Sequence, residues 1–254
     1  MIEYRFIFEK SPPMRFQVQL DRTRHDSSAS GPHADWTRLC VHQCSLCPLK
    51  TTTETHCPAA VDLESIVEQF RQVVSFEQVR VEVETPQRTY VKSCDVQTGL
   101  RSMIGLVLAT SQCPWFNRLR SLADSHLPFA SIEETLIRVT GNYLLQQYQL
   151  ACEGGTPDLA MLGLEEYYQS LCDINQTFKR RLEMASTSDA NLNAIGAFST
   201  LAQGISLSLR DKLQAIRSTM APIAIEVPAS TAASREFSHR ERIDIGCDAG
   251  EKSP

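Results

Sequence analysis

The order in which two hydrophobic periodicities occur constrains the fold of this chain more than any other feature. Apolar and polar residues alternate, as in half-buried strands, over segments 3–8, 15–20, 78–84 and 88–92. Turn-forming residues separate the members of each pair, at Ser11–Pro13 and at Thr85–Gln87. From residue 97 onward, apolar residues recur at helical spacing instead. Strands followed by helices predict an α+β fold, with a small N-terminal antiparallel sheet of two hairpins packed on a larger helical part.

The helices are predicted from apolar spacing and from capping residues. One helix over 62–74, with Asp62 as its N-cap, lies between the hairpins and would cover one face of the sheet. Ser131 and Glu134 form a capping box that opens a helix to about Ala151. A short strand is predicted at 36–41. Further helices are predicted over 100–109, 115–123, 164–182, 189–201 and 208–216.

We expect residues 1–220 to form a single domain, since 254 residues with 42% hydrophobic side chains can bury one large core. Residues 1–95 would carry the sheet and a cysteine-rich loop, and residues 96–220 the helical part. After Val227 the chain becomes small, polar and charged. Such a segment buries too little apolar area to offset its ordering entropy, so a disordered tail is predicted over 228–254.

The segment from His42 to Ala60 contains a cluster of cysteines. Cys44 and Cys47 are spaced C-x2-C, and Cys57 follows after nine residues. A C-x2-C turn presents two thiolates to one cation, as in zinc knuckles and iron–sulfur loops. The amino terminus, MIEYRFIFEK, lacks the features of a secretory signal, so we expect a cytoplasmic protein. Clustered cysteines in a reducing compartment bind metals more often than they form structural disulfides.

Three thiolates are one fewer than the usual four, and Cys113 is the main candidate for the fourth. Pro114 suits the first position of a helix, which predicts that Cys113 is an N-cap whose thiolate the helix dipole favours. Proline also follows Cys47 and Cys57, and a Cys-Pro step ends the bacterial ferredoxin motif. We therefore favour an iron–sulfur cluster slightly over zinc. The alternative metal ligands are His42, His56 and His126.

Simpler interpretations of these residues stay open. The clustered thiols can be inert side chains under a loop, or the C-x2-C pair can be a disulfide switch. We expect Cys94, Cys152 and Cys172 to be small buried hydrophobic residues on strands or helices, whereas Cys247 falls in the polar tail. His126 is alternatively a core histidine, a ligand or a proton carrier. Helix capping explains the polar residues at Glu133–Glu134 and Asp189–Asn193.

Charge and hydropathy exclude several classes of partner. The net charge is −5 and the basic residues are scattered, so nucleic acid is not expected. The longest strongly apolar run, Met103–Thr110, is much shorter than the ~20 residues that cross a bilayer, so no membrane span is expected. No G-x-G-x-x-G, Walker A, H-E-x-x-H or G-x-S-x-G motif occurs. A protein partner, the oligomeric state and the substrate are left open.

Six segments together resemble an uncharacterised family of bacterial proteins over about residues 1–213. They are PHADWTRL, HQCSLCPL, HCPAAVDL, ATSQCPWF, HLPFASIEETL and DANLNA. The resemblance implies a bacterial source, and it implies that one site contains Cys44, Cys47, Cys57, Cys113 and His126. It implies no activity.

Three hypotheses about function follow. In the first, four thiolates hold a closed metal centre with a binding, structural or sensing role. In the second, the protein is a metal-dependent oxidoreductase, with an open metal position and with His126 or Glu134 as the proton carrier. In the third, it is a helical interaction module with inert thiols. Whether the chain is an enzyme is therefore undecided by the sequence.

Overall fold

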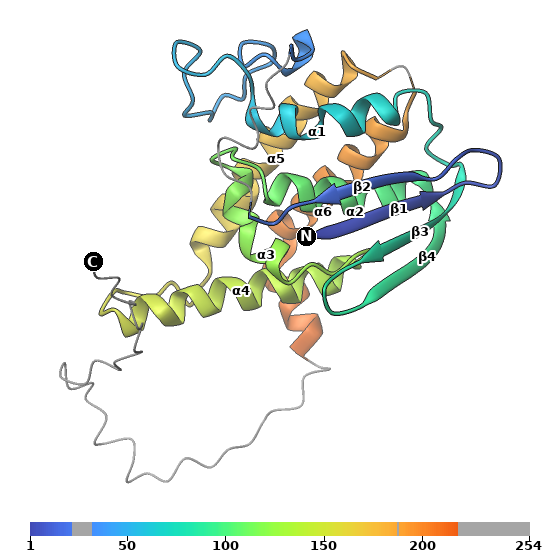
Figure 1. Ribbon diagram of the computed structural model, residues 1–254. Coiled ribbons are helices and arrows are strands. Elements are labelled where there is room, and N and C mark those ends of the chain that lie inside the picture. Colours follow the sequence, from blue (N-terminus) through green and yellow to red (C-terminus); the bar gives the residue numbers. More distant parts are fainter. Residues whose placement is uncertain (22–31, 187, 218–254) are drawn as a thin grey trace, which may run out of the picture. The chain divides into compact units, whose positions relative to one another are not determined.

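The computed structural model describes residues 1–21, 32–186 and 188–217 (Figure 1). The chain divides into two compact units, Met1–Leu213 and Gln214–Pro254. The predicted tail over 228–254 and Cys247 lie outside the described residues. The fold of the first unit is α+β, as the order of the periodicities predicts.

A four-stranded antiparallel sheet is built from two hairpins (Figure 1). Its strands are β1 (Ile2–Ile7), β2 (Met14–Val18), β3 (Gln78–Glu84) and β4 (Thr89–Asp95). The spatial order is β2-β1-β3-β4, so β1 and β3 are the central strands. Tyr4 and Phe6 on β1 pair with Val83 and Val81 on β3, and all four side chains are buried. The alternating pattern therefore places one face of the sheet on the core.

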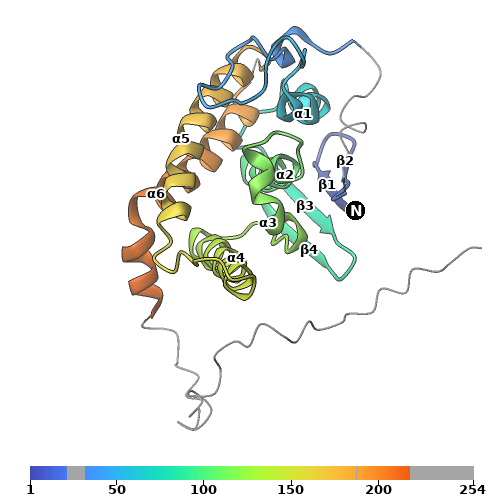
Figure 2. The same ribbon diagram turned by 90° about the vertical axis from the view of Figure 1, so that its left-hand side faces the viewer.

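Helices α1 (Pro58–Gln69) and α2 (Val96–Ala109) cover this face (Figure 2). The ring of Phe70, just after α1, lies 5.0 Å from that of Phe6. In α2, a Cβ atom added at Gly99 would lie 2.7 Å from a methyl carbon of Val81 and 2.8 Å from the ring of Phe6. Glycine therefore allows α2 to pack closely on the two central strands.

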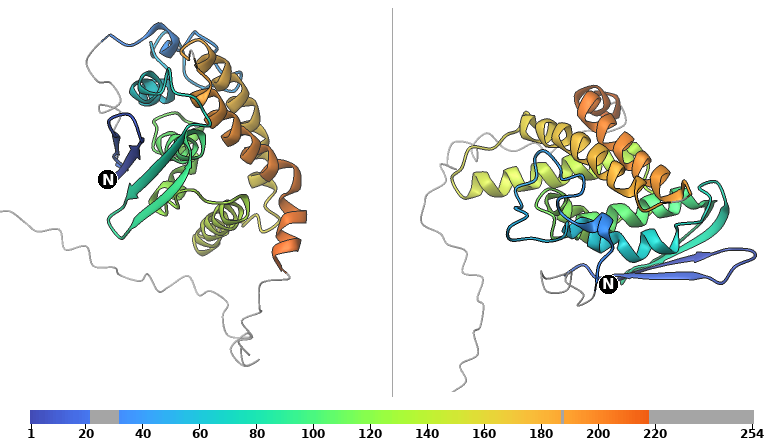
Figure 3. Two further views of the ribbon diagram at one scale, coloured as in Figure 1. Left: turned by 90° about the vertical axis from the view of Figure 1, so that its right-hand side faces the viewer. Right: turned by 90° about the horizontal axis from the view of Figure 1, so that it is seen from above.

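The remaining helices are α3 (Arg120–Asp124), α4 (Ile132–Cys152), α5 (Leu162–Glu183) and α6 (Ala190–Arg217). The predicted capping box of Ser131 and Glu134 opens α4. Helices α5 and α6 lie side by side (Figure 3). None of the described helices is long and apolar enough to cross a membrane.

Three element boundaries differ from the predictions. Helix α1 begins at Pro58 with Cys57 as its N-cap, four residues before the predicted start at Asp62. Helix α6 is continuous, whereas two helices were predicted; the glycine and serines at 204–208 each lower helix propensity by only about 1 kcal/mol or less, which is too little to end a helix. The predicted helix over 115–123 divides into a 3₁₀ helix, Phe116–Leu119, and α3.

The predicted strand at 36–41 does not form. Its first residues belong to a 3₁₀ helix, Asp35–Thr37, and only Arg38 makes an isolated β-bridge, to His56. The carbonyl groups of this segment are instead directed toward a side chain of α5. Because this segment has no neighbouring strand, its carbonyl groups accept hydrogen bonds from a side chain instead of from a sheet.

Candidate metal centre

Four cysteines from three separate segments line one small cavity of about 20 Å³. They are Cys44, Cys47, Cys57 and Cys113. The other walls of the cavity are largely apolar and include Leu39, Phe116, Ile174 and Phe178. Among the described residues, no three His, Cys, Asp or Glu side chains are gathered closely enough to hold a metal ion as they stand. The four cysteines therefore share one cavity but do not form a preassembled metal site.

Burial and neighbouring thiols favour the neutral form of Cys44, Cys57 and Cys113 in the absence of a cation. Burial raises the pKa of Cys44 to about 11, and the nearby thiols of Cys57 and Cys47 contribute to this increase. Burial likewise raises the pKa of Cys113 to about 12, with contributions from Cys57 and Cys44. Burial also raises the pKa of Cys57. Cys113 is therefore electrostatically coupled to the cluster that precedes it by more than fifty residues.

Backbone amides that follow two of the cysteines favour the thiolate form. After Cys57 and Pro58, the amides of Ala59 and Ala60 offset part of the increase in the pKa of Cys57, although its side chain makes no capping hydrogen bond to α1. After Cys113 and Pro114, the amides of Trp115 and Phe116 offset part of the increase in the pKa of Cys113. Amides close to sulfur are one of the means by which proteins tune metal–thiolate centres.

The helix N-cap was predicted at the wrong cysteine. Cys113 precedes a 3₁₀ helix, Phe116–Leu119, and not an α-helix. The N–H of Asn117 donates to the carbonyl oxygen of Cys113 at 2.9 Å, which closes a local turn. The cysteine at the start of an α-helix is Cys57, so the dipole of the twelve-residue α1 acts on that sulfur.

The buried guanidinium of Arg181, on α5, holds the loop that leads to the C-x2-C motif. Arg181 is 1% exposed, and its Nη1 donates to the carbonyl oxygens of Trp36 at 2.8 Å and Arg38 at 2.6 Å. Its Nη2 makes longer contacts with the carbonyl oxygens of Leu39 at 3.4 Å and His42 at 3.3 Å. Within the described part of the chain, no carboxylate forms an ion pair with Arg181. Its positive charge instead lowers the pKa values of Cys44 and Cys57.

Trp115 joins the C-x2-C loop to the segment that contains Cys113. Its indole Nε1 donates to the carbonyl oxygen of Leu46 at 2.7 Å. Its own carbonyl accepts from the hydroxyl of Tyr167 at 2.9 Å, and the two rings stack. Within the loop, the Cys47 N–H donates to the Cys44 carbonyl at 3.0 Å and fixes the turn between the two thiols.

The three alternative ligands do not line this cavity. The Nδ1 atom of His56 forms a hydrogen bond with the Thr37 hydroxyl at 2.8 Å. His42 has a positive φ of 43° and presents its carbonyl to Arg181. His126 lines a different pocket, where its Nε2 lies 2.6 Å from the hydroxyl oxygen of Tyr4. The structure therefore gathers the four cysteines but separates them from His126.

The sequence matches the model of one known protein family. Residues 2–221 match the model of a domain of unknown function, DUF6901. The chain belongs to the DUF6901 family. No curated protein is significantly similar to it. No solved structure is significantly similar to it either. The membership confirms an uncharacterised family, while the activity of this DUF6901 domain has to be argued from its own residues.

Three further cysteines of the DUF6901 domain are less buried than predicted. Cys94, Cys152 and Cys172 lie on β4, α4 and α5, so a strand or helix was correctly predicted for each. However, Cys152 is exposed and the other two are half-buried. The reason is that β4 is an edge strand with a mostly exposed face, and that Cys152 ends a helix whose last turn is exposed.

Arg181 is the residue of this site that sequence reasoning missed. The signal was present, because Arg181 follows Phe178 by three residues and precedes Leu182 on the apolar stripe of α5. A charged side chain within an apolar stripe indicates a buried cation that forms hydrogen bonds with the protein. Asn175 is the other polar residue among the buried positions of α5. Asp189, for which a cap was predicted, directly precedes α6. Its carboxylate accepts hydrogen bonds from the backbone N–H and the hydroxyl of Ser75.

Proposed function

We propose that the protein binds a metal centre through Cys44, Cys47, Cys57 and Cys113, with a structural or sensing role. The observation that carries this proposal is the shared cavity, which brings together thiols from a loop, a helix N-terminus and a turn after α2. Four thiolates leave no coordination position open. Such a closed centre suits a structural or electron-transfer role better than hydrolysis. The separate location of His126 likewise gives no support to an oxidoreductase that would use it as a proton carrier.

The charge of Arg181 supports a centre made of thiolates. Four thiolates around Zn²⁺ carry two excess negative charges, and an oxidised four-iron cluster with four cysteines carries the same. Arg181 is buried beside Cys44 and Cys57, and within the described residues its hydrogen bonds are to carbonyl groups. A buried cation is normally paired with an anion. A metal–thiolate centre would supply that anion.

The residues after the cysteines favour an iron–sulfur cluster slightly over zinc. Proline follows Cys47, Cys57 and Cys113, and a Cys-Pro step ends the bacterial ferredoxin motif. In a zinc centre, each sulfur would lie about 2.3 Å from the ion.

The centre would connect segments that are far apart in sequence. Cys57 begins α1, and Cys113 follows the end of α2, the two helices that cover the sheet. Binding free energies of structural metals reach roughly 10 kcal/mol, and they add to the free energy of folding. Oxidative or chelating conditions that remove the centre would release the loop. The protein would in this way report redox state or metal supply.

Anaerobic purification followed by metal analysis and an absorption spectrum tests the proposal. Iron and sulfide with visible absorption identify a cluster. One equivalent of zinc in a colourless protein identifies a structural zinc centre. Folded protein that contains neither metal, and that takes up neither iron with sulfide nor zinc after reduction, would contradict the proposal and favour an interaction module with inert thiols.

A further inference from the structure

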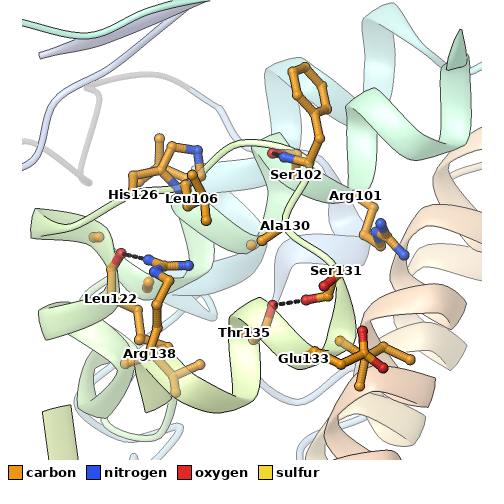
Figure 4. A pocket seen from close by; sticks show the side chains of 17 residues that line it. Arg101, Ser102, Leu106, Leu122, His126, Ala130, Ser131, Glu133, Thr135 and Arg138 are labelled. Atoms are coloured by element: carbon orange, nitrogen blue, oxygen red, sulfur yellow. Dashed lines mark hydrogen bonds between the residues drawn. The ribbon is translucent and has the colours of Figure 1, made fainter. Parts of the chain in front are cut away.

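A larger pocket, of about 400 Å³, lies among α2, α3, the α3–α4 loop and the first turns of α4 (Figure 4). This volume falls within the roughly 300–1,000 Å³ of small-molecule sites. Most of the lining is apolar, from Leu106, Ala109, Leu119, Leu122, Leu127 and Ile132. The pocket shares no lining residue with the cysteine cavity, so it is a separate site.

Arg138, on α4, brings a positive charge to the apolar wall of this pocket (Figure 4). Its Nη2 donates to the carbonyl oxygens of Leu122 at 2.8 Å and Ser125 at 2.7 Å, which fixes the guanidinium. Its Nε is buried and has no hydrogen-bond partner among the described residues. No described carboxylate forms an ion pair with it. Glu134, one turn earlier on α4, raises the pKa of Arg138 from a longer distance and offsets its charge in part. The guanidinium is therefore held by backbone carbonyl groups, without a described carboxylate in direct contact.

A chain of hydrogen bonds behind the pocket determines which nitrogen of His126 carries the proton. The Phe129 N–H donates to the Ser102 hydroxyl at 3.2 Å, which lies 2.7 Å from the hydroxyl of Tyr4. Tyr4 in turn lies 2.6 Å from His126 Nε2. Every hydroxyl hydrogen finds an acceptor only if Ser102 donates to Tyr4 and Tyr4 donates to Nε2. The neutral imidazole then carries its hydrogen on Nδ1.

That Nδ1–H has no acceptor among the residues that the structure describes, and it is not one of the buried polar atoms left without a partner. The Nδ1 atom is therefore not fully buried, and it belongs to a ring that lines the pocket. The charge of Arg138 acts on His126, since it contributes to lowering the pKa of the imidazole. In Figure 4, His126 and Arg138 lie on the same side of the pocket. Unlike the buried Nε, the Nη1 of Arg138 is not one of the fully buried atoms, and it takes no part in the two hydrogen bonds that fix the guanidinium. Arg138 Nη1 and His126 Nδ1 are thus two donors, on residues that line one apolar cavity, without acceptors among the described residues.

We propose that this pocket binds a small organic anion, with its carboxylate on Arg138 and His126 and its apolar body against the leucines of α2 and α3. The balance of charges agrees with this ligand class. Arg101 and Glu133 also line the pocket, on the side opposite Arg138 and His126 in Figure 4. Two arginines against one glutamate give the lining a net positive charge, which Glu134, outside the lining, offsets in part through its effect on Arg138. An uncharged ligand would leave the guanidinium of Arg138 without a counter-ion in direct contact.

Titration of the purified full-length protein with decanoate and with decanol tests the proposal. The two probes have the same chain length and differ in charge. We expect decanoate to bind saturably at one site. Its affinity should be at least about tenfold higher than that of decanol, because one charge-assisted hydrogen bond contributes about that ratio of dissociation constants. Arg138→Gln should lower the affinity for decanoate by about tenfold or more and leave the affinity for decanol unchanged. Arg180→Gln, at an exposed position on α5, is the matched control and should bind decanoate normally.

A second variant keeps the test decisive if Arg138→Gln does not fold. Ala130→Phe places a ring in the pocket beside Ser131 and should abolish decanoate binding. Equal affinity for decanoate and decanol, or unchanged decanoate binding by Ala130→Phe, would overturn the proposal. Metal content should be the same in all of these proteins. Failure of the anion site is therefore distinguishable from failure of the metal centre.

Discussion

At the scale of single residues, Arg181 is the side chain on which the loop before the C-x2-C motif depends. Its guanidinium contacts four carbonyl groups between Trp36 and His42. Hydrogen bonds to a buried charged group contribute about 1.5–3 kcal/mol each, and removal of the donor leaves buried carbonyls unsatisfied. This residue therefore couples α5 to the cysteine loop.

We predict that Arg181→Leu lowers the free energy of unfolding by about 3 kcal/mol, from the loss of its two short hydrogen bonds. Arg180→Leu is the matched control, because Arg180 is exposed on the same turn of α5. Its effect should stay within about 0.5 kcal/mol. Urea unfolding of the two variants, compared with the unmutated protein, measures the difference. Equal stabilities of the two variants would show that the loop does not depend on Arg181.

His126 predicts a pH dependence of stability. Burial, with a smaller contribution from Arg138, lowers the pKa of His126 from 6.5 to about 3. Above pH 6.5 the imidazole is neutral in both the folded and the unfolded state. Between pH 6.5 and pH 3 only the unfolded state binds the proton, so stability falls by about 1.4 kcal/mol per pH unit.

Between pH 6.5 and pH 5, the unmutated protein should therefore lose about 1.5–2 kcal/mol more than His126→Asn, which cannot titrate. Urea unfolding at a series of pH values measures this difference. Parallel curves for the two proteins over this range would mean that His126 protonates as readily in the folded as in the unfolded state.

At the scale of secondary structure, the packing of α2 on the sheet depends on Gly99. A Cβ atom at this position would overlap Val81 and Phe6, whereas one at Gly141, on α4, meets no atom within 4 Å. Gly99→Ala should therefore destabilise the protein by about 1–3 kcal/mol through overpacking. Gly141→Ala should stabilise it by up to about 1 kcal/mol through helix propensity. Thermal unfolding measures both, and equal shifts in Tm would contradict the close contact between α2 and the sheet.

Local sequence signals predicted most elements correctly, and the failures have physical causes. Both hairpins, α2 and the capping box of α4 follow from alternation, apolar spacing and side-chain caps. The start of α1 was misplaced because Cys57 does not resemble a usual N-cap, although Pro58 at the first helical position was a valid signal. The strand predicted at 36–41 failed because its carbonyl groups bind Arg181, which is distant in sequence.

At the scale of the whole molecule, the candidate site depends on contacts between distant segments. The sequence identified Cys44, Cys47 and Cys57 as a cluster from their spacing, and Cys113 as a fourth candidate from its proline. The position of Arg181 on the apolar stripe of α5 indicated a buried cation, but not that it binds the loop before the C-x2-C motif. Nor could the sequence separate His126 from the cysteines, because both depend on how α5 and the α3–α4 loop pack. If the four thiolates hold one centre, that centre joins the loop before α1 to the turn after α2.

Metal occupancy of Cys113→Ser, compared with Cys94→Ser, is the most direct test of this account. Both variants replace one thiol, but Cys94 lies on an edge strand and does not line the cavity. Elemental analysis of the anaerobically purified proteins should give full occupancy for Cys94→Ser and a loss of most of the metal for Cys113→Ser. Full occupancy in Cys113→Ser would contradict the four-thiolate centre.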